Sequence, residues 1–176
     1  MRSRITPVLF GLTLLSPFTQ AAPHAHQHGT GKLDIAVEAT RITIRFETPL
    51  DNLVGFERAP RTDQERREVD AAVARLNAAA SLFTIDPAAR CKLQRVELSS
   101  AALKLGQAST QPAAAGHAEL DASIEFDCVD AAKAGYIDHG LFAFTRLQRL
   151  LVQVAAPGRQ LKRDLKGPAG RIALAR

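Results

Sequence analysis

The segment AELDASIEFDC, residues 118–128, carries the clearest structural signal in the chain. Apolar side chains occupy every second position from Ala118 to Cys128, and polar side chains occupy the positions between them. Because residues two apart in a strand point to the same face, this segment predicts a half-buried β-strand. Cys128 falls on the apolar face, so one of the cysteines is expected on the core side of a sheet.

The same period of two recurs on both sides of this segment. The other ranges expected as strands are 32–38, 41–47, 91–105, 147–154 and 160–165, with an edge strand at 172–174. Only Ala39 and Thr40 separate the first two, which predicts a tight hairpin. In the third, the alternation slips between Leu93 and Val96, as a strand with a β-bulge would show.

One segment has helical periodicity instead. Thr62 and Glu65 form a capping-box pattern, and apolar side chains then recur at helical spacing from Val69 to Phe83. We expect one amphipathic helix over about residues 62–81, preceded by a compact loop over 50–60. Its polar face is most simply a solvated surface.

These elements predict an α+β fold, a mostly antiparallel sheet of six or seven strands with one main amphipathic helix packed on one face. Strands and helices do not alternate regularly, so a parallel sheet is not expected. Residues 106–116 have too little apolar side chain to pack, and we interpret them as a mobile loop between two paired strands. Residues 129–146 are expected to form a short helical or irregular connection.

The N-terminal residues predict export. Arg2 and Arg4 precede an apolar run, Ile5 to Leu15, which at about eleven residues is well short of the roughly twenty that span a bilayer. We expect a signal peptide that is cleaved after Ala21, with no membrane span left after cleavage. The resulting division of the chain is a signal peptide over 1–21, a His-containing N-terminal segment over 22–31 and a single α+β domain over 32–176.

Composition narrows the function. Without the signal peptide the net charge is near +3, the whole chain is 5% aromatic and has no Trp, and its basic residues are dispersed, which argues against nucleic-acid binding. Export permits oxidation, so the two cysteines, Cys91 and Cys128, are expected to form a disulfide; the alternative is two unpaired buried thiols. No motif for a catalytic nucleophile, a phosphate-binding loop or a dinucleotide is present, so we expect no enzyme.

Histidines gather at the start of the expected mature chain. His24, His26 and His28 are spaced two apart, and in an extended segment such residues project to the same side, so their imidazoles can converge on one cation. Zinc takes four nitrogen, sulfur or oxygen donors, so the folded domain must supply the rest. His117 and Glu119, on the polar face of the 118–128 strand, are the expected source.

Two weaker candidates and several alternatives remain. Asp121 extends the row of Glu119, as a ligand or as an acceptor that orients an imidazole, and His139 is favoured as a turn residue over a ligand. The histidine run can also be a solvated tail, and His117 an ordinary surface residue. Copper competes with zinc for these donors. A metal-independent interaction module and a hydrolase with a zinc-bound water are the other functional alternatives.

Several stretches of the chain resemble one family. They are His26-Gln27-His28-Gly29, the loop 49–60 with Asn52-Leu53-Val54-Gly55-Phe56-Glu57, Gly116-His117-Ala118-Glu119 with Phe126-Asp127-Cys128, and Leu141-Phe142. On these the chain resembles the ZrgA-like periplasmic zinc-binding proteins of Gram-negative bacteria. The resemblance implies a periplasmic protein that binds zinc and assists a zinc-uptake ABC transporter and its binding protein.

The chain also departs from that family. Members often carry a long tract rich in His, Asp and Glu at the position of residues 106–116, and here that position holds no histidine. High-capacity zinc storage is therefore not expected. The site that the resemblance retains consists of His26, His28 and His117, with Glu119 or His24 as the next ligand; for Asn52 and Glu57 a structural role in a packed loop is the default.

Overall fold

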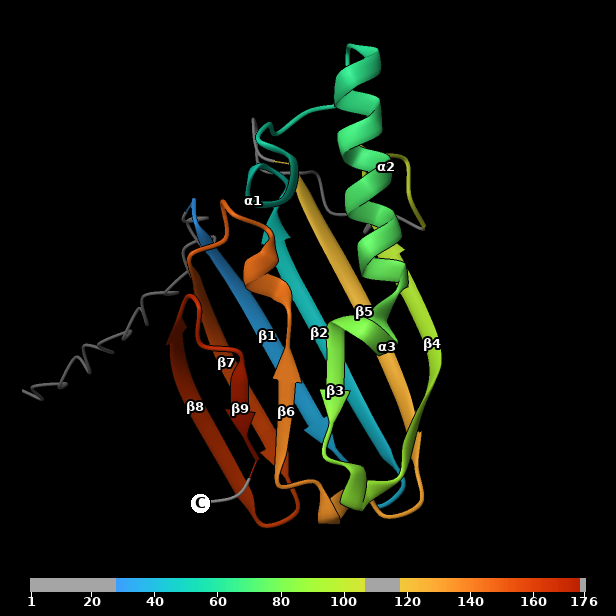
Figure 1. Ribbon diagram of the computed structural model, residues 1–176, viewed down its shortest axis with the longest axis vertical. Coiled ribbons are helices and arrows are strands. Elements are labelled where there is room, and N and C mark those ends of the chain that lie inside the picture. Colours follow the sequence, from blue (N-terminus) through green and yellow to red (C-terminus); the bar gives the residue numbers. More distant parts are fainter. Residues whose placement is uncertain (1–27, 107–117, 175–176) are drawn as a thin grey trace, which may run out of the picture.

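The structure is a computed structural model that describes residues 28–106 and 118–174, in which nine strands form two sheets (Figure 1). The elements in chain order are β1 (Thr30–Val37), β2 (Arg41–Pro49), α1 (Asp51–Val54), α2 (Asp63–Asn77), α3 (Ala79–Leu82), β3 (Phe83–Ile85), η1 (Pro87–Ala89), β4 (Cys91–Ser99), β5 (Glu119–Cys128), η2 (Ala131–Lys133), β6 (Tyr136–His139), η3 (Leu141–Ala143), β7 (Arg149–Ala156), β8 (Arg159–Lys166) and β9 (Arg171–Ala173). The expected signal peptide and residues 22–27 lie outside the described residues. Among the described helices, none has the length and apolar character that a bilayer span requires.

The larger sheet has six strands in the order β4-β5-β2-β1-β7-β8. β1 pairs in parallel with β7, which makes the sheet mixed and corrects the prediction of a mostly antiparallel sheet. The parallel pairing begins where Gln148 and Arg149 both donate backbone N–H bonds to the carbonyl of Gly29. Alternation along a strand fixes which face is buried, but it does not fix the neighbouring strand or its direction.

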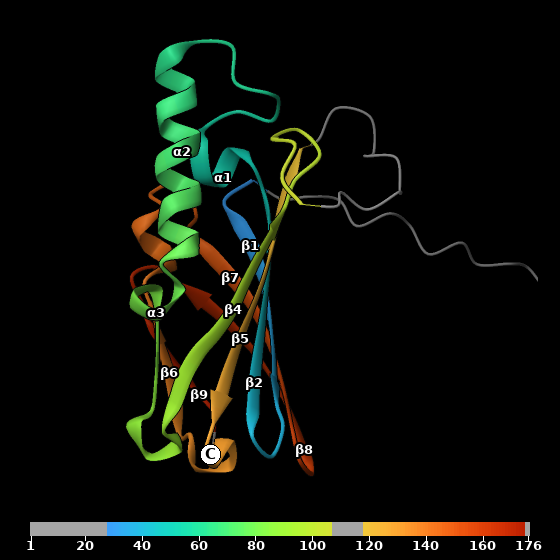
Figure 2. The same cartoon turned by 90° about the vertical axis from the view of Figure 1, so that its right-hand side faces the viewer.

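The smaller sheet has three strands in the order β3-β6-β9. It lies with α2 and α3 on one face of the larger sheet, as the two views of Figures 1 and 2 show. β6 falls in the segment expected to be irregular, and β3 begins at Phe83, just after the expected end of the helix. The short strand expected at the C-terminal end is present, but it pairs with β6 and so belongs to this second sheet.

The main helix is shorter than expected. Thr62 caps it, with its hydroxyl accepting the Glu65 N–H at 3.1 Å, as the capping-box pattern predicts. α2 ends at Asn77, and after a break at Ala78 the single turn α3 leads into β3. Alanines satisfy helical spacing whether or not they are buried, so the pattern could not reveal this break.

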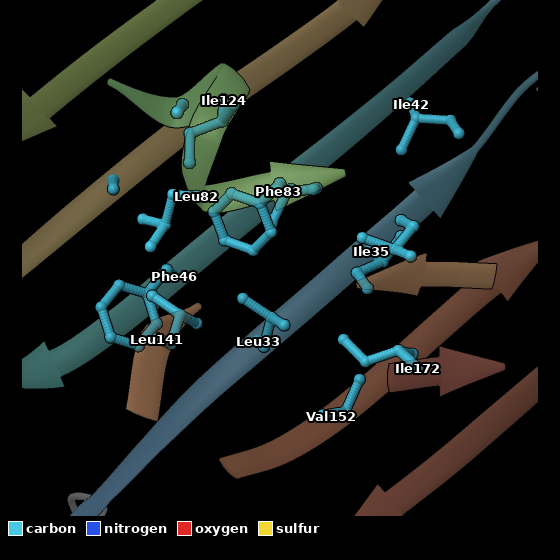
Figure 3. Packing of buried hydrophobic residues seen from close by; sticks show 14 of the residues in the cluster. Leu33, Ile35, Ile42, Phe46, Leu82, Phe83, Ile124, Leu141, Val152 and Ile172 are labelled. Carbon is cyan, nitrogen blue, oxygen red and sulfur yellow. The ribbon is translucent and has the colours of Figure 1, made fainter. Parts of the chain in front are cut away.

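The core fills the space between the two layers. Leu33, Phe46 and Ile124 point from the larger sheet toward Leu82 and Phe83 of the covering layer, and these side chains pack together in Figure 3. The opposite face of the larger sheet is polar, with exposed side chains such as Asp34 and Arg45. The strand alternation therefore separates a dry face from a wet one, as the sequence predicts.

The disulfide between Cys91 and Cys128 is present and joins the first residue of β4 to the last residue of β5. The two cysteines are cross-strand partners, and the expected bulge follows as a register shift between Leu93 and Arg95. The disulfide joins the edge strand β4 to β5, the strand with the clearest alternation. The chain that connects these two strands includes residues 107–117, which lie outside the described residues.

We expect the Cys91→Ser/Cys128→Ser variant to lose about 2–5 kcal/mol of unfolding free energy, because the disulfide closes a long loop in the unfolded chain. Urea unfolding of both proteins under oxidising conditions measures the loss. Reducing agent should destabilise the parent chain to the level of the variant. Equal midpoints without reducing agent would show that the bond contributes nothing.

Candidate metal site

His28 lies in the turn that precedes β1, and two carboxylates lie beside it. Its Nδ1 is 3.2 Å from the Asp51 Oδ2 and 3.8 Å from the Glu57 Oε1. The His28 side chain is 63% exposed, whereas those of Asp51 and Glu57 are 24% and 14% exposed. The imidazole therefore projects to solvent from a partly buried acidic seat.

The buried side chain of Asn52 holds this arrangement together. Its Oδ1 accepts the Gly29 N–H at 2.6 Å, while its Nδ2 donates to the Thr30 carbonyl at 3.0 Å and to the Thr48 hydroxyl at 2.9 Å. Asn52 thus ties the residue after His28 to the end of β2. The structural role expected for Asn52 fits these bonds, since both amide hydrogens are used in them.

Gly55 allows the chain to turn back so that Glu57 reaches His28. Gly55 ends α1 in the left-handed region, with φ of 87°, and donates its N–H to the Asp51 carbonyl. A Cβ at Gly55 would lie 2.8–2.9 Å from the guanidinium of Arg146, which is the flexible end of a side chain and can move, so the positive φ is the stronger reason for glycine here. The turn therefore brings one carboxylate from α1 and one from the following loop to the same imidazole.

Glu119 lies at the same end of the sheet. It is the first residue of β5 and the register partner of Pro49 in β2, and the Leu50 N–H donates to the Ala118 carbonyl at 2.8 Å. β1 lies on the other side of β2, so the starts of β1 and β5 are two strand spacings apart, about 10 Å. The turn with His28 and the strand with Glu119 thus lie at the same end of the sheet, on either side of β2.

Asp121 stands in a row of negative charge on the polar face of the sheet. Its register partner is Glu47, and Glu119 is two residues away on the same strand face. The pKa of Asp121 is raised to about 6, first because the surrounding protein removes part of its hydration and then because Glu119 and Glu47 repel its charge; Lys32 acts in the opposite direction. A cation bound here would relieve that repulsion.

His139 is not a turn residue, and it lies apart from the other candidates. It ends β6 in the smaller sheet, is buried, and its Nδ1 accepts the Leu141 N–H at 3.3 Å. Its ring packs against Phe142 at 5.3 Å between centroids. Burial lowers the pKa of His139, so the neutral imidazole is favoured inside the core.

The described residues provide part of the predicted site. His28, Glu119 and Asp121 are placed by the structure, whereas His24, His26 and His117 lie outside residues 28–106 and 118–174. Within those ranges, no three side chains of His, Cys, Asp or Glu are close enough together to hold a metal ion. The structure adds Asp51 and Glu57, which sequence analysis did not select as ligands.

The signal for these two was present in the loop that follows β2. It carries Asp51, Asn52 and Glu57 between two prolines, and the short helix α1 and the turn at Gly55 bring Asp51 and Glu57 toward His28. A family model, described as the ZrgA family zinc uptake protein, matches residues 25–174. The chain belongs to the ZrgA family.

The ZrgA family assignment connects the chain to zinc uptake. No curated protein sequence matches the chain significantly. The matched residues begin just before the His26-Gln27-His28 run and end with the last strand, so the seat of His28, the strand that carries Glu119 and the second sheet all lie inside the family domain.

In this ZrgA family member, we expect Asn52→Ala to lower the unfolding free energy by about 2–4 kcal/mol, because it leaves the buried Thr48 hydroxyl and the partly buried Gly29 N–H and Thr30 carbonyl without their bonds to Asn52. Urea unfolding measures the change. Asn77→Ala, at the exposed end of α2, is the matched control and should change the free energy by less than about 0.5 kcal/mol. Equal losses in both variants would contradict the role given to Asn52.

The raised pKa of Asp121 predicts a pH-dependent stability. The folded chain holds this proton more tightly than the unfolded chain, so the carboxylate costs no stability below about pH 4, and its cost grows with pH until about pH 6. Asp121→Asn should therefore raise the melting temperature at pH 7.5 and leave it unchanged at pH 4. The side chain is exposed, so screening keeps the gain below about 1 kcal/mol.

The control for this experiment is Asp34→Asn on the same polar face. Asp34 has Arg45 and Gln153 as its register partners, and neither is acidic. Thermal unfolding of the parent and both variants at the two pH values, with chelator present, completes the comparison. The same gain for Asp121→Asn at pH 4 and pH 7.5 would show that charge repulsion is not its cause.

Proposed function

We propose that this protein binds zinc in the bacterial periplasm and assists zinc acquisition, together with a zinc-uptake ABC transporter and its binding protein, without catalysing a reaction. The observation that carries the proposal is the seat of His28, where two carboxylates meet an exposed imidazole at the end of the sheet that also bears Glu119. Membership of a family of zinc uptake proteins supports zinc as the metal and zinc acquisition as the process.

The donor types fit zinc. Imidazole nitrogen and carboxylate oxygen are both zinc ligands, and a ligating histidine donates its other ring N–H to an acceptor such as a carboxylate, a backbone carbonyl or water. The Nδ1 of His28 lies within hydrogen-bond distance of Asp51, so an N–H on that nitrogen leaves Nε2 for the metal. Asp51 is then the orienting group, and Glu57 or Glu119 supplies oxygen.

The remaining ligands come from residues next to the described ends. His26 precedes His28 by two positions, and His117 precedes Glu119 by two. Two residues of chain span at most about 7 Å, so both imidazoles are within reach of the end of β2. The proposed zinc ligands are thus His26, His28 and His117 with one carboxylate, while His24 is a further donor.

Exposure suits a site that takes up and releases its cargo. A zinc ion held by His28 would remain accessible to a competing chelator or a partner protein, because the side chain is 63% exposed. The predicted signal peptide and the Cys91–Cys128 disulfide fit an oxidising compartment outside the cytoplasm. Zinc on its way into the cell passes through that compartment in Gram-negative bacteria.

We expect His28→Ala to weaken zinc binding about 10–100-fold, because it removes a ligand, and Asp51→Asn to weaken it about tenfold, because it removes the group that orients His28. Competition with a zinc-responsive dye measures both constants on untagged protein. Asp63→Asn, at the exposed start of α2, is the matched control and should leave the affinity unchanged. Unchanged affinity in His28→Ala would remove the basis of the proposed site.

Metal content decides between zinc and copper. The chain purified without an affinity tag should carry zinc at about one ion per protein, and copper in its place would redirect the proposal. Zinc transfer from the loaded chain to the binding protein of a zinc ABC transporter tests the assisting role. Transfer no faster than zinc dissociation into chelator alone would reduce the role to zinc binding.

A further inference from the structure

The two outer strands of the larger sheet differ in how their open edges are built. β4 carries the bulge after Leu93, and α2 and α3 contact it (Figure 2). β8 pairs with β7 over all eight residues without a register shift, and no strand among the described residues pairs with its other edge. β8 thus presents a regular row of backbone donors and acceptors at one side of the molecule in Figure 1.

Charge on β8 is almost entirely positive. Its basic residues are Arg159, Lys162, Arg163 and Lys166, and no carboxylate of the described residues forms an ion pair with any of them. The single acid, Asp164, is held by Arg149 of β7, with its Oδ1 accepting the Arg149 Nε–H at 2.7 Å. A strand added at this edge would therefore lie against four cations that form no ion pair within the described chain, although Asp164 offsets part of the charge of Lys166.

The basic side chains of β8 determine, by their charge, which kind of strand can pair with this edge. Lysines on an edge strand hinder pairing with a second copy of the same strand, because like charges would lie opposite one another. The same cations favour an acidic strand, for which both the backbone bonds and the side-chain charges are complementary. β4, the other outer strand of the larger sheet, differs, because Arg95 and Glu97 form an ion pair on the strand itself.

We propose that the free edge of β8 is a docking site for an extended acidic segment of a partner protein, which adds to the sheet as a seventh strand. The alternation of β8 specifies the segment. Leu161 and Leu165 lie on the core side, where they pack at the margin of the core, and call for apolar residues opposite them. In the added strand, we expect acidic residues opposite Lys162, Arg163 and Lys166. Opposite Asp164 we expect an uncharged residue.

The inference is independent of the zinc site, so its test is run with chelator present. The probe is a fluorescent peptide with the core Glu-Val-Thr-Glu-Glu-Val, which matches residues 166 to 161 in antiparallel order. Anisotropy at low salt should show saturable binding to the full mature chain. Lys162→Glu/Lys166→Glu should weaken that binding at least about tenfold.

Matched controls separate strand addition from simple charge attraction. Lys92→Glu/Arg95→Glu places the same charge change on β4 and should leave the affinity within about twofold. N-methylation of alternate peptide residues removes the donors of one peptide edge, so one phase should abolish binding and the other should retain it. Hydrogen exchange should slow at alternate amides of β8 when the peptide is bound.

Three outcomes overturn the proposal. Equal binding of both N-methylated phases would reduce β8 to a cationic patch without strand pairing. An equal loss of affinity in the β4 variant would show that the peptide binds elsewhere or at no single site. Absence of saturable binding at low salt would mean that the cations of β8 only prevent other strands from pairing with this edge.

Discussion

The arrangement of the candidate site depends on one buried amide. The side chain of Asn52 forms hydrogen bonds to the turn before β1, to the first residue of β1 and to the end of β2. These bonds lie at the end of the β1–β2 hairpin that is farthest from its connecting turn. The Asn52 side chain itself has almost no access to water, because the residue is 1% exposed, so its polar atoms depend on these bonds. The position of His28, one residue before Gly29, follows from this amide.

The rest of the molecule is organised around the same end of the sheet. The core side chains of β1, β2 and β5 hold the strands in register, so Glu119 is carried to the neighbourhood that Asn52 has fixed on the other side of β2. The packed sheet supplies rigidity, and the turn and loop at its end supply donors. The carboxylates of Glu47, Glu119 and Asp121 add negative charge beside these donors. Repulsion from Glu119 and Glu47 is one of the causes that raise the pKa of Asp121.

Sequence reasoning selected two of the residues that the structure places at this end of the sheet. It selected His28 and Glu119 because imidazoles two residues apart and a His-x-Glu pattern on a strand are visible in one dimension. It missed Asp51 as a ligand neighbour and left Glu57 as a packed loop residue, because Asp51 is placed beside His28 by α1 and Glu57 only by the left-handed turn at Gly55. It placed His139 in a turn, whereas the strand partners of β6 bury it.

The sequence by itself determined which segments form the strands of the larger sheet, which of their faces is buried, where β4 bulges and which two cysteines pair. These features depend on local alternation or on there being no other cysteine to pair with. Only the tertiary structure decided that β1 lies between β2 and β7, that β7 runs parallel to it and that three short strands form a second layer. The physical reason is that side-chain periodicity records burial alone, whereas the order of strands is selected by packing between residues far apart in the chain.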